Sequence, residues 1–196
     1  MRMSCAHALT RLATSNEVRF WNARCGESMV SGIKPRLALD TNVLFDLAEG
    51  RDFAITVLEV LVEESAHINV CPTVLVEMEY EISHPASVQK ARRAERAFEC
   101  IRSYGITPFT LTPVQHALAQ RFSNSLQDTG VLPHGEFHDG CVLAEVALCP
   151  LEFLLTSDKH LLSIDTEALR GNFRHFHLPS VQIVSPRHLY VLLKRM

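Results

Sequence analysis

Short apolar runs alternate with longer segments of helical periodicity, and this alternation restricts the fold more than any other feature of the sequence. The runs with strand character are 36–40 (RLALD), 67–72 (HINVCP), 106–111 (ITPFTL), 151–158 (LEFLLTSD) and 181–184 (VQIV). Strands that alternate with helices form right-handed β–α–β units, and near-continuous apolar strands are typical of sheets covered on both faces. The pattern predicts an α/β fold: one three-layer α/β/α domain with a five-stranded parallel sheet.

Cap signals support the helices between these strands. Thr73, after Pro72, is a predicted N-cap, and Thr112 is another because Pro113 suits the first helical position. Gly105 is a predicted C-cap for the basic helical segment before it. The first predicted helix begins at Thr41 or Asn42 and has Leu44, Phe45 and Leu47 on its apolar face. The other predicted helices are 53–65, 73–82, 87–105, 112–127, 138–149, 159–164 and 185–196.

Composition limits the classes of protein to consider. The chain has 196 residues, 47% of them hydrophobic, which suits one sizeable packed domain. A formal net charge of −3 argues against a generally basic nucleic-acid coat protein. No apolar run approaches the length of a membrane span. The six cysteines form no CxxC pair, which favours buried thiols in a reducing cytoplasm.

The first part of the chain differs from the rest. Residues 1–33 lack the apolar core of a secretory signal, and we expect an N-terminal extension that is flexible or not native, since translation could begin at Met29. Residues 34–196 are the predicted domain.

Acidic residues occur where the predicted strands pass into helices. Asp40 ends the first strand and Asp158 ends the fourth. Asp139 is in phase with the buried stripe of the helix that it starts, and Glu77 lies in the first turns of the helix after the second strand. Because sites in such sheets form beyond the carboxyl ends of the strands, we expect these acids to converge.

Converging carboxylates need compensation. Several such groups raise one another's pKa values, and a hard divalent cation such as Mg²⁺ or Mn²⁺ resolves the repulsion. Two such ions about 3.5–4 Å apart can activate a water and stabilise the leaving oxygen of a phosphodiester. The alternative for each residue alone is structural: Asp40, Asp139 and Asp158 could be N-caps, and Glu77 a solvated helix residue.

Four segments together resemble a known family. LALDTNVLFDL, PTVLVEMEYEI, HDGCVLAEVAL and FLLTSDKHLL look like the signature segments of PIN-domain proteins, in the family's order, over residues 36–186. The resemblance implies a five-stranded parallel sheet flanked by helices. It also implies metal-dependent cleavage of RNA, in many bacterial cases by the toxin of a VapC-type toxin–antitoxin pair.

The resemblance assigns roles to particular residues. By it, Asp40, Glu77, Asp139 and Asp158 are the metal-binding acids. Asn42 orients Asp40, and Thr156 or Ser157 binds the water shell or a phosphate. Glu145 follows Asp139 by six residues and points away from it on a helix, so Glu81 is the expected auxiliary acid.

A histidine pair and a basic segment also suggest possible sites. His134 and His138 have zinc-like spacing, but the Pro and Gly residues around them do not favour a regular helix. The basic segment at 90–102 could hold RNA phosphates, although a solvated helix face is the favoured interpretation.

The resulting hypothesis is a cytoplasmic, Mg²⁺- or Mn²⁺-dependent endoribonuclease, expected to be the toxin of a toxin–antitoxin system. An antitoxin partner and a homodimer are implied by the resemblance. Two alternatives remain: a non-catalytic PIN-like scaffold that binds RNA or a partner, and a metal phosphohydrolase acting on small phosphoesters.

Overall fold

The computed structural model describes residues 34–194, and side chains up to Tyr190. The predicted extension over residues 1–33 lies outside this range. The strands are β1 (Arg36–Leu39), β2 (His67–Val70), β3 (Thr107–Pro108), β4 (Phe153–Leu155) and β5 (Gln182–Val184). They form one parallel sheet in the order β3-β2-β1-β4-β5. The predicted five-stranded parallel sheet is confirmed.

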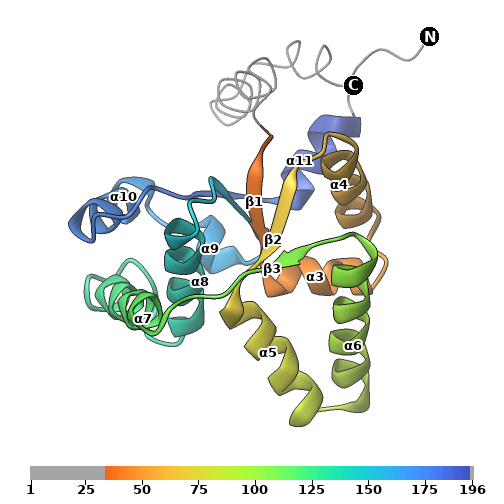
Figure 1. Ribbon diagram of the computed structural model, residues 1–196, viewed down its shortest axis with the longest axis horizontal. Coiled ribbons are helices and arrows are strands. Elements are labelled where there is room, and N and C mark those ends of the chain that lie inside the picture. Colours follow the sequence, from red (N-terminus) through yellow and green to blue (C-terminus); the bar gives the residue numbers. More distant parts are fainter. Residues whose placement is uncertain (1–33, 195–196) are drawn as a thin grey trace.

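Helices connect the strands and cover the sheet. They are α3 (Thr41–Ala48), α4 (Asp52–Glu63), α5 (Pro72–Ser83), α6 (Val88–Ser103), α7 (Pro113–Asp128), α8 (Phe137–Leu148), α9 (Lys159–Leu162), α10 (Thr166–His175) and α11 (Pro186–Lys194). In Figure 1, α4 and α11 lie on one side of the strands, and α7, α8 and α10 lie on the other. The helical pair α5 and α6 extends beyond the sheet from the ends of the strands. Within the described residues no helix has the length and apolarity to cross a membrane.

The strand order places a topological switch point at the centre of the sheet. From β1 the chain adds β2 and β3 on one side and then β4 and β5 on the other. The carboxyl ends of β1 and β4 therefore flank the position where the direction of winding reverses, which is where open α/β sheets form their sites. Asp40 follows β1 directly, and Thr156 to Asp158 follow β4.

Local sequence signals explain most helix ends. Thr112 and Gln115 form a capping box at the start of α7, as the Thr112–Pro113 pair predicted. Gly105 has a φ of +66°, which allows the chain to turn sharply after α6. The core between the layers is continuous and includes the central strands and the inner faces of α3, α5 and α8.

One predicted cap was wrong, and one helix was missed. Thr73 is not the N-cap of α5; the cap position is Cys71, and Thr73 lies inside the helix. The segment that begins at Lys159 forms only a four-residue helix, because Asp165 starts a separate helix, α10, by capping Glu167 and Ala168. The preferences of single residues for cap positions predicted neither the start of α5 nor the start of α10.

Candidate active site

Asp40 lies at the carboxyl end of β1 and is 3% exposed. It is the N-cap of α3: its Oδ1 accepts a hydrogen bond from the Thr41 amide at 2.8 Å, and its Oδ2 accepts one from the Thr156 hydroxyl at 2.6 Å. Burial raises the pKa of Asp40 to about 6, the Thr156 hydroxyl opposes this, and the charges of Glu77 and Asp158 add to it. Asp40 is therefore an N-cap, as the structural alternative predicted, and the neighbouring acids also face its carboxyl group.

Thr156 joins the ends of the two central strands. Its hydroxyl donates to Asp40 and accepts from the Asp158 amide at 2.9 Å. Asp158 in turn caps α9, with its Oδ1 accepting from the amides of His160 at 2.6 Å and Leu161 at 3.2 Å. These bonds occupy Oδ1 of Asp158 and fix the carboxyl group beside the switch point.

Glu77 extends from α5 towards the same place. One carboxylate oxygen accepts a short hydrogen bond from the Thr41 hydroxyl, and the other lies 3.3 Å from Nδ1 of His138. The first of these contacts joins α5 to α3, and the second joins α5 to α8. Glu77 is thus a half-buried residue held by contacts with α3 and α8. The alternative that it is a solvated helix residue was wrong.

Asp139 has the least compensated carboxyl group of the four. It lies in the first turn of α8, whose N-cap is Glu136, so the cap alternative for Asp139 was wrong. Its Oδ2 is buried and has no hydrogen-bond partner among the described residues. Burial raises the pKa of Asp139 to about 8, and the charges of Asp40, Asp158, Glu136 and Glu77 raise it further in that order.

The remaining predicted residues occupy different positions. Asn42 is exposed, and its Nδ2 lies 3.5 Å from Asp40 Oδ2, a weak contact. Ser157 donates to Asp46 Oδ2 at 2.8 Å rather than to an acid of the cluster. Glu81 lies 3.8 Å from Lys90 Nζ, and its Oε2 is buried without a partner within the described chain.

Glu145 was expected to point away from Asp139, and its contacts agree. It is 1% exposed, and it accepts hydrogen bonds from the Thr73 amide at 3.1 Å and the Thr73 hydroxyl at 2.8 Å. The cap that α5 lacks from its own sequence is therefore supplied by α8. Glu145 connects the helix of Asp139 to the helix of Glu77.

Sequence reasoning overlooked three residues at this site: Thr41, His138 as a partner of Glu77, and Asp46. Asp46 lies four residues after Asn42 on α3, so both project from one helix face and line the same pocket. That spacing was readable from the sequence. The contacts of Thr41 and His138 with Glu77 were not, because they join residues that are far apart along the chain.

The donor set fits a hard divalent cation. Carboxylates dominate it, one buried oxygen has no partner among the described residues, and burial with the neighbouring acids raises the pKa values of Asp40 and Asp139. Among residues 34–194, however, no three acid, His or Cys side chains are already arranged as a metal site. Hydroxyl and amide groups bond to both oxygens of Asp40 and to one oxygen each of Glu77 and Asp158. The chemistry of the donor set supports a cation.

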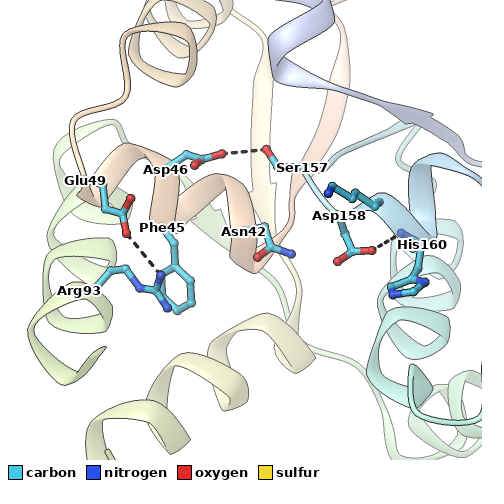
Figure 2. A pocket seen from close by; sticks show the side chains of 9 residues that line it. Asn42, Phe45, Asp46, Glu49, Arg93, Ser157, Asp158 and His160 are labelled. Carbon is cyan, nitrogen blue, oxygen red and sulfur yellow. Dashed lines mark hydrogen bonds and ion pairs between the residues drawn. The ribbon is translucent and has the colours of Figure 1, made fainter. Parts of the chain in front are cut away.

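A pocket of about 360 Å³ adjoins the cluster on the side of Asp158 (Figure 2). It lies between α3, α6 and the start of α9. Its lining consists of Asn42, Phe45, Asp46, Glu49, Arg93, Ser157, Asp158, Lys159 and His160. Figure 2 shows Arg93 lying over the Phe45 ring across the pocket from Asp158.

Comparisons with known proteins agree with this architecture. Residues 37–132 match the family model of the PIN domain. The match includes Asp40 and Glu77 and ends before Asp139 and Asp158. No curated protein matches the chain.

Among solved structures, the chain is similar to VapBC2 from Rickettsia felis, which was crystallised bound to a DNA fragment from their promoter. The TM-score is 0.53 at 15% identity, and the alignment covers 76% of this chain and 97% of that one. FitAcB from Neisseria gonorrhoeae is also similar, with a TM-score of 0.48 at 18% identity, covering 78% of this chain and 99% of that one. The first of these likenesses supports the same fold.

Proposed function

The chain belongs to the PIN-domain family, and from that premise we propose that it is a Mg²⁺- or Mn²⁺-dependent endoribonuclease. PIN domains are in general nucleases that hydrolyse phosphodiester bonds. The observation that carries the proposal is Asp139: its buried carboxyl oxygen has no partner in the described part of the chain, and three further acids lie near it at the switch point. Such a group is costly unless a cation compensates it.

We assign the four acids the role of holding the cation. Asp40 and Asp158 lie on the ends of the two central strands, and Thr156 fixes them relative to each other. Asp139 and Glu77 approach from α8 and α5. A bound divalent ion supplies positive charge that makes a water more acidic and stabilises the leaving oxygen. No side chain needs to act as a nucleophile.

The protein's own side chains prepare this site. The Thr41 and Thr156 hydroxyls direct Glu77 and Asp40, and the α9 amides orient Asp158 through its Oδ1. Asn42 and Ser157 line the adjoining pocket, where they can contact a substrate phosphate or its water shell. Glu81 remains the proposed auxiliary acid, one turn beyond Glu77 on α5.

We also propose an antitoxin partner and a homodimer, in a cytoplasmic toxin–antitoxin system. The support for the partner is the likeness to VapBC2, a complex crystallised with a DNA fragment from their promoter. Residues 34–196 would form the nuclease domain of such a toxin.

The test is cleavage of a mixed RNA pool with Mg²⁺ or Mn²⁺, compared with the same reaction in EDTA. Asp40→Asn is the inactive control, because it keeps the shape of the side chain that caps α3 and removes the charge. We expect cutting that depends on the ion, is lost in the control, and leaves 5′-phosphate and 3′-hydroxyl ends.

Each other result excludes the proposal in a defined way. Cutting that persists in EDTA contradicts the role of the metal. A folded protein that binds RNA without cutting it is a scaffold. Hydrolysis of a chromogenic phosphoester without cleavage of RNA indicates a small-molecule phosphohydrolase.

A further inference from the structure

The pocket beside Asp158 has features that the cleavage chemistry does not use. Its volume of about 360 Å³ falls within the roughly 300–1,000 Å³ of small-ligand pockets. It shares Asp158 with the acid cluster, so whatever occupies it lies next to the reacting phosphate. Its far wall is formed by Arg93 of α6 and Phe45 of α3 (Figure 2).

Arg93 is held in a defined position on this wall. Its guanidinium carbon lies 4.0 Å from the centroid of the Phe45 ring, and its Nη1 lies 3.4 Å from Glu49 Oε1. Glu49 is shared, because Arg51 approaches it more closely, at 2.8 Å. Arg93 Nε is buried without an acceptor among the described residues, so Glu49 satisfies only part of the guanidinium.

The pocket has two cationic side chains, Arg93 and Lys159, beside three acidic ones. Of the acids, Asp46 accepts from Ser157, Glu49 is paired with arginines, and Asp158 belongs to the acid cluster. Lys159, in contrast, forms no ion pair within residues 34–190 and is exposed. Lys159 is thus available to a phosphate of a ligand.

We propose that this pocket binds one nucleotide of single-stranded RNA next to the scissile phosphate, with its base against the Arg93 guanidinium and a phosphate at Lys159. The proposal rests on the proposed ribonuclease function and names a subsite for its substrate. A guanidinium plane supported by an aromatic ring is a platform on which unpaired bases stack. The basic α6 segment was interpreted from the sequence as a solvated helix face. In the structure Arg93 is partly buried and lines the pocket, whereas Arg92 is exposed.

The test is binding of a fluorescent single-stranded RNA of about 12 nucleotides, a length within the range of single-strand sites. Binding is measured by anisotropy in EDTA, so that neither metal nor cleavage contributes. Arg93→Ala is compared with Arg92→Ala, which removes the same charge from an exposed neighbour outside the pocket. Lys159→Ala tests the opposite wall with an exposed residue, where a folding defect is least expected.

We expect Arg93→Ala to weaken binding about tenfold and Arg92→Ala to weaken it by less than about twofold. Lys159→Ala should lower the salt slope of binding by about 0.7, the value for one phosphate contact on a single strand. Arg93→Lys keeps the charge and should recover only part of the affinity, because it loses the planar stack.

The proposal is overturned if Arg93→Ala and Arg92→Ala weaken binding equally, or if the folded wild-type protein does not bind RNA. It is also overturned if Arg93→Ala lowers only the melting temperature, since Arg93 is then a structural ion pair. Failure of the nuclease function is distinguishable: RNA then binds in an Arg93-dependent manner but is not cut when the metal is added.

Discussion

Helix α8 carries a buried carboxyl group, Glu145, and a partly buried one, Asp139, and the contrast between them separates structure from proposed function. Glu145, near its end, has both oxygens hydrogen-bonded to Thr73. Asp139, in its first turn, has a buried oxygen without a partner among residues 34–194 and faces other acids. Burial raises the pKa of both groups, but only at Glu145 do hydrogen bonds counteract it. A buried acid with partners is explained by folding, whereas one without them calls for a ligand.

The sharpest way to break this comparison is to neutralise each acid. We expect Asp139→Asn to lower the rate of RNA cleavage about 10³-fold, since electrostatic help from a cation is worth several kcal/mol. Glu145→Gln keeps an oxygen for the Thr73 amide and should leave the rate within about threefold of wild type. Single-turnover cleavage with Mn²⁺ measures both rates. If the two variants lose activity equally, the distinction between the acids is wrong.

A second prediction concerns the free energy of unfolding, to which Glu145 should contribute more than Asp139. Glu145→Ala leaves the Thr73 amide and hydroxyl unpaired beside a cavity, which should cost about 3 kcal/mol. For a domain of this size, that lowers the melting temperature by about 6–12 °C. Glu63→Ala, at an exposed position on α4, is the control and should have almost no effect. Calorimetry measures both, and an unchanged melting temperature for Glu145→Ala would exclude its capping role.

The sequence was sufficient for all five strands and for the placement of Asp40 and Asp158 at strand ends, because strand–helix alternation and apolar runs are local signals. It did not show that β1 and β4 are neighbours, since strand order depends on packing between distant segments. The cap that Glu145 provides could not be predicted either, because Thr73 lies 72 residues away along the chain. Asp139 was misjudged as a possible cap, since nothing in PHGEFHDG indicates that α8 begins at Phe137.

The pH dependence of stability should also report on Asp139. The pKa of Asp139 is raised to about 8 in the folded protein, so its stabilising contribution is complete below its unfolded pKa of about 4 and is lost as the pH rises through 8. Metal-free protein should therefore lose roughly 2 kcal/mol between pH 6 and pH 8, a figure reduced for solvent screening. Denaturant unfolding in EDTA measures this, and Asp139→Asn should flatten the profile. A profile that rises with pH would contradict the assignment.

The smallest expected effect isolates one hydrogen bond. Thr73→Val removes the hydroxyl that Glu145 accepts from and leaves the amide bond in place, which should cost about 1 kcal/mol. The melting temperature should fall by about 2–4 °C, and cleavage should be unaffected. If Thr73→Val lowers the melting temperature as much as Glu145→Ala, the hydroxyl bond and not the amide bond accounts for most of the stabilisation by Glu145.

The central claim is that the acids around Asp139 hold a divalent cation, and calorimetric titration with Mn²⁺ tests it most directly. We predict that wild-type protein and Glu145→Gln bind Mn²⁺ with equal affinity, and that Asp139→Asn binds it at least about tenfold more weakly. Equal binding by Asp139→Asn and wild type would contradict the account, because its buried, unpaired oxygen would then not be a ligand.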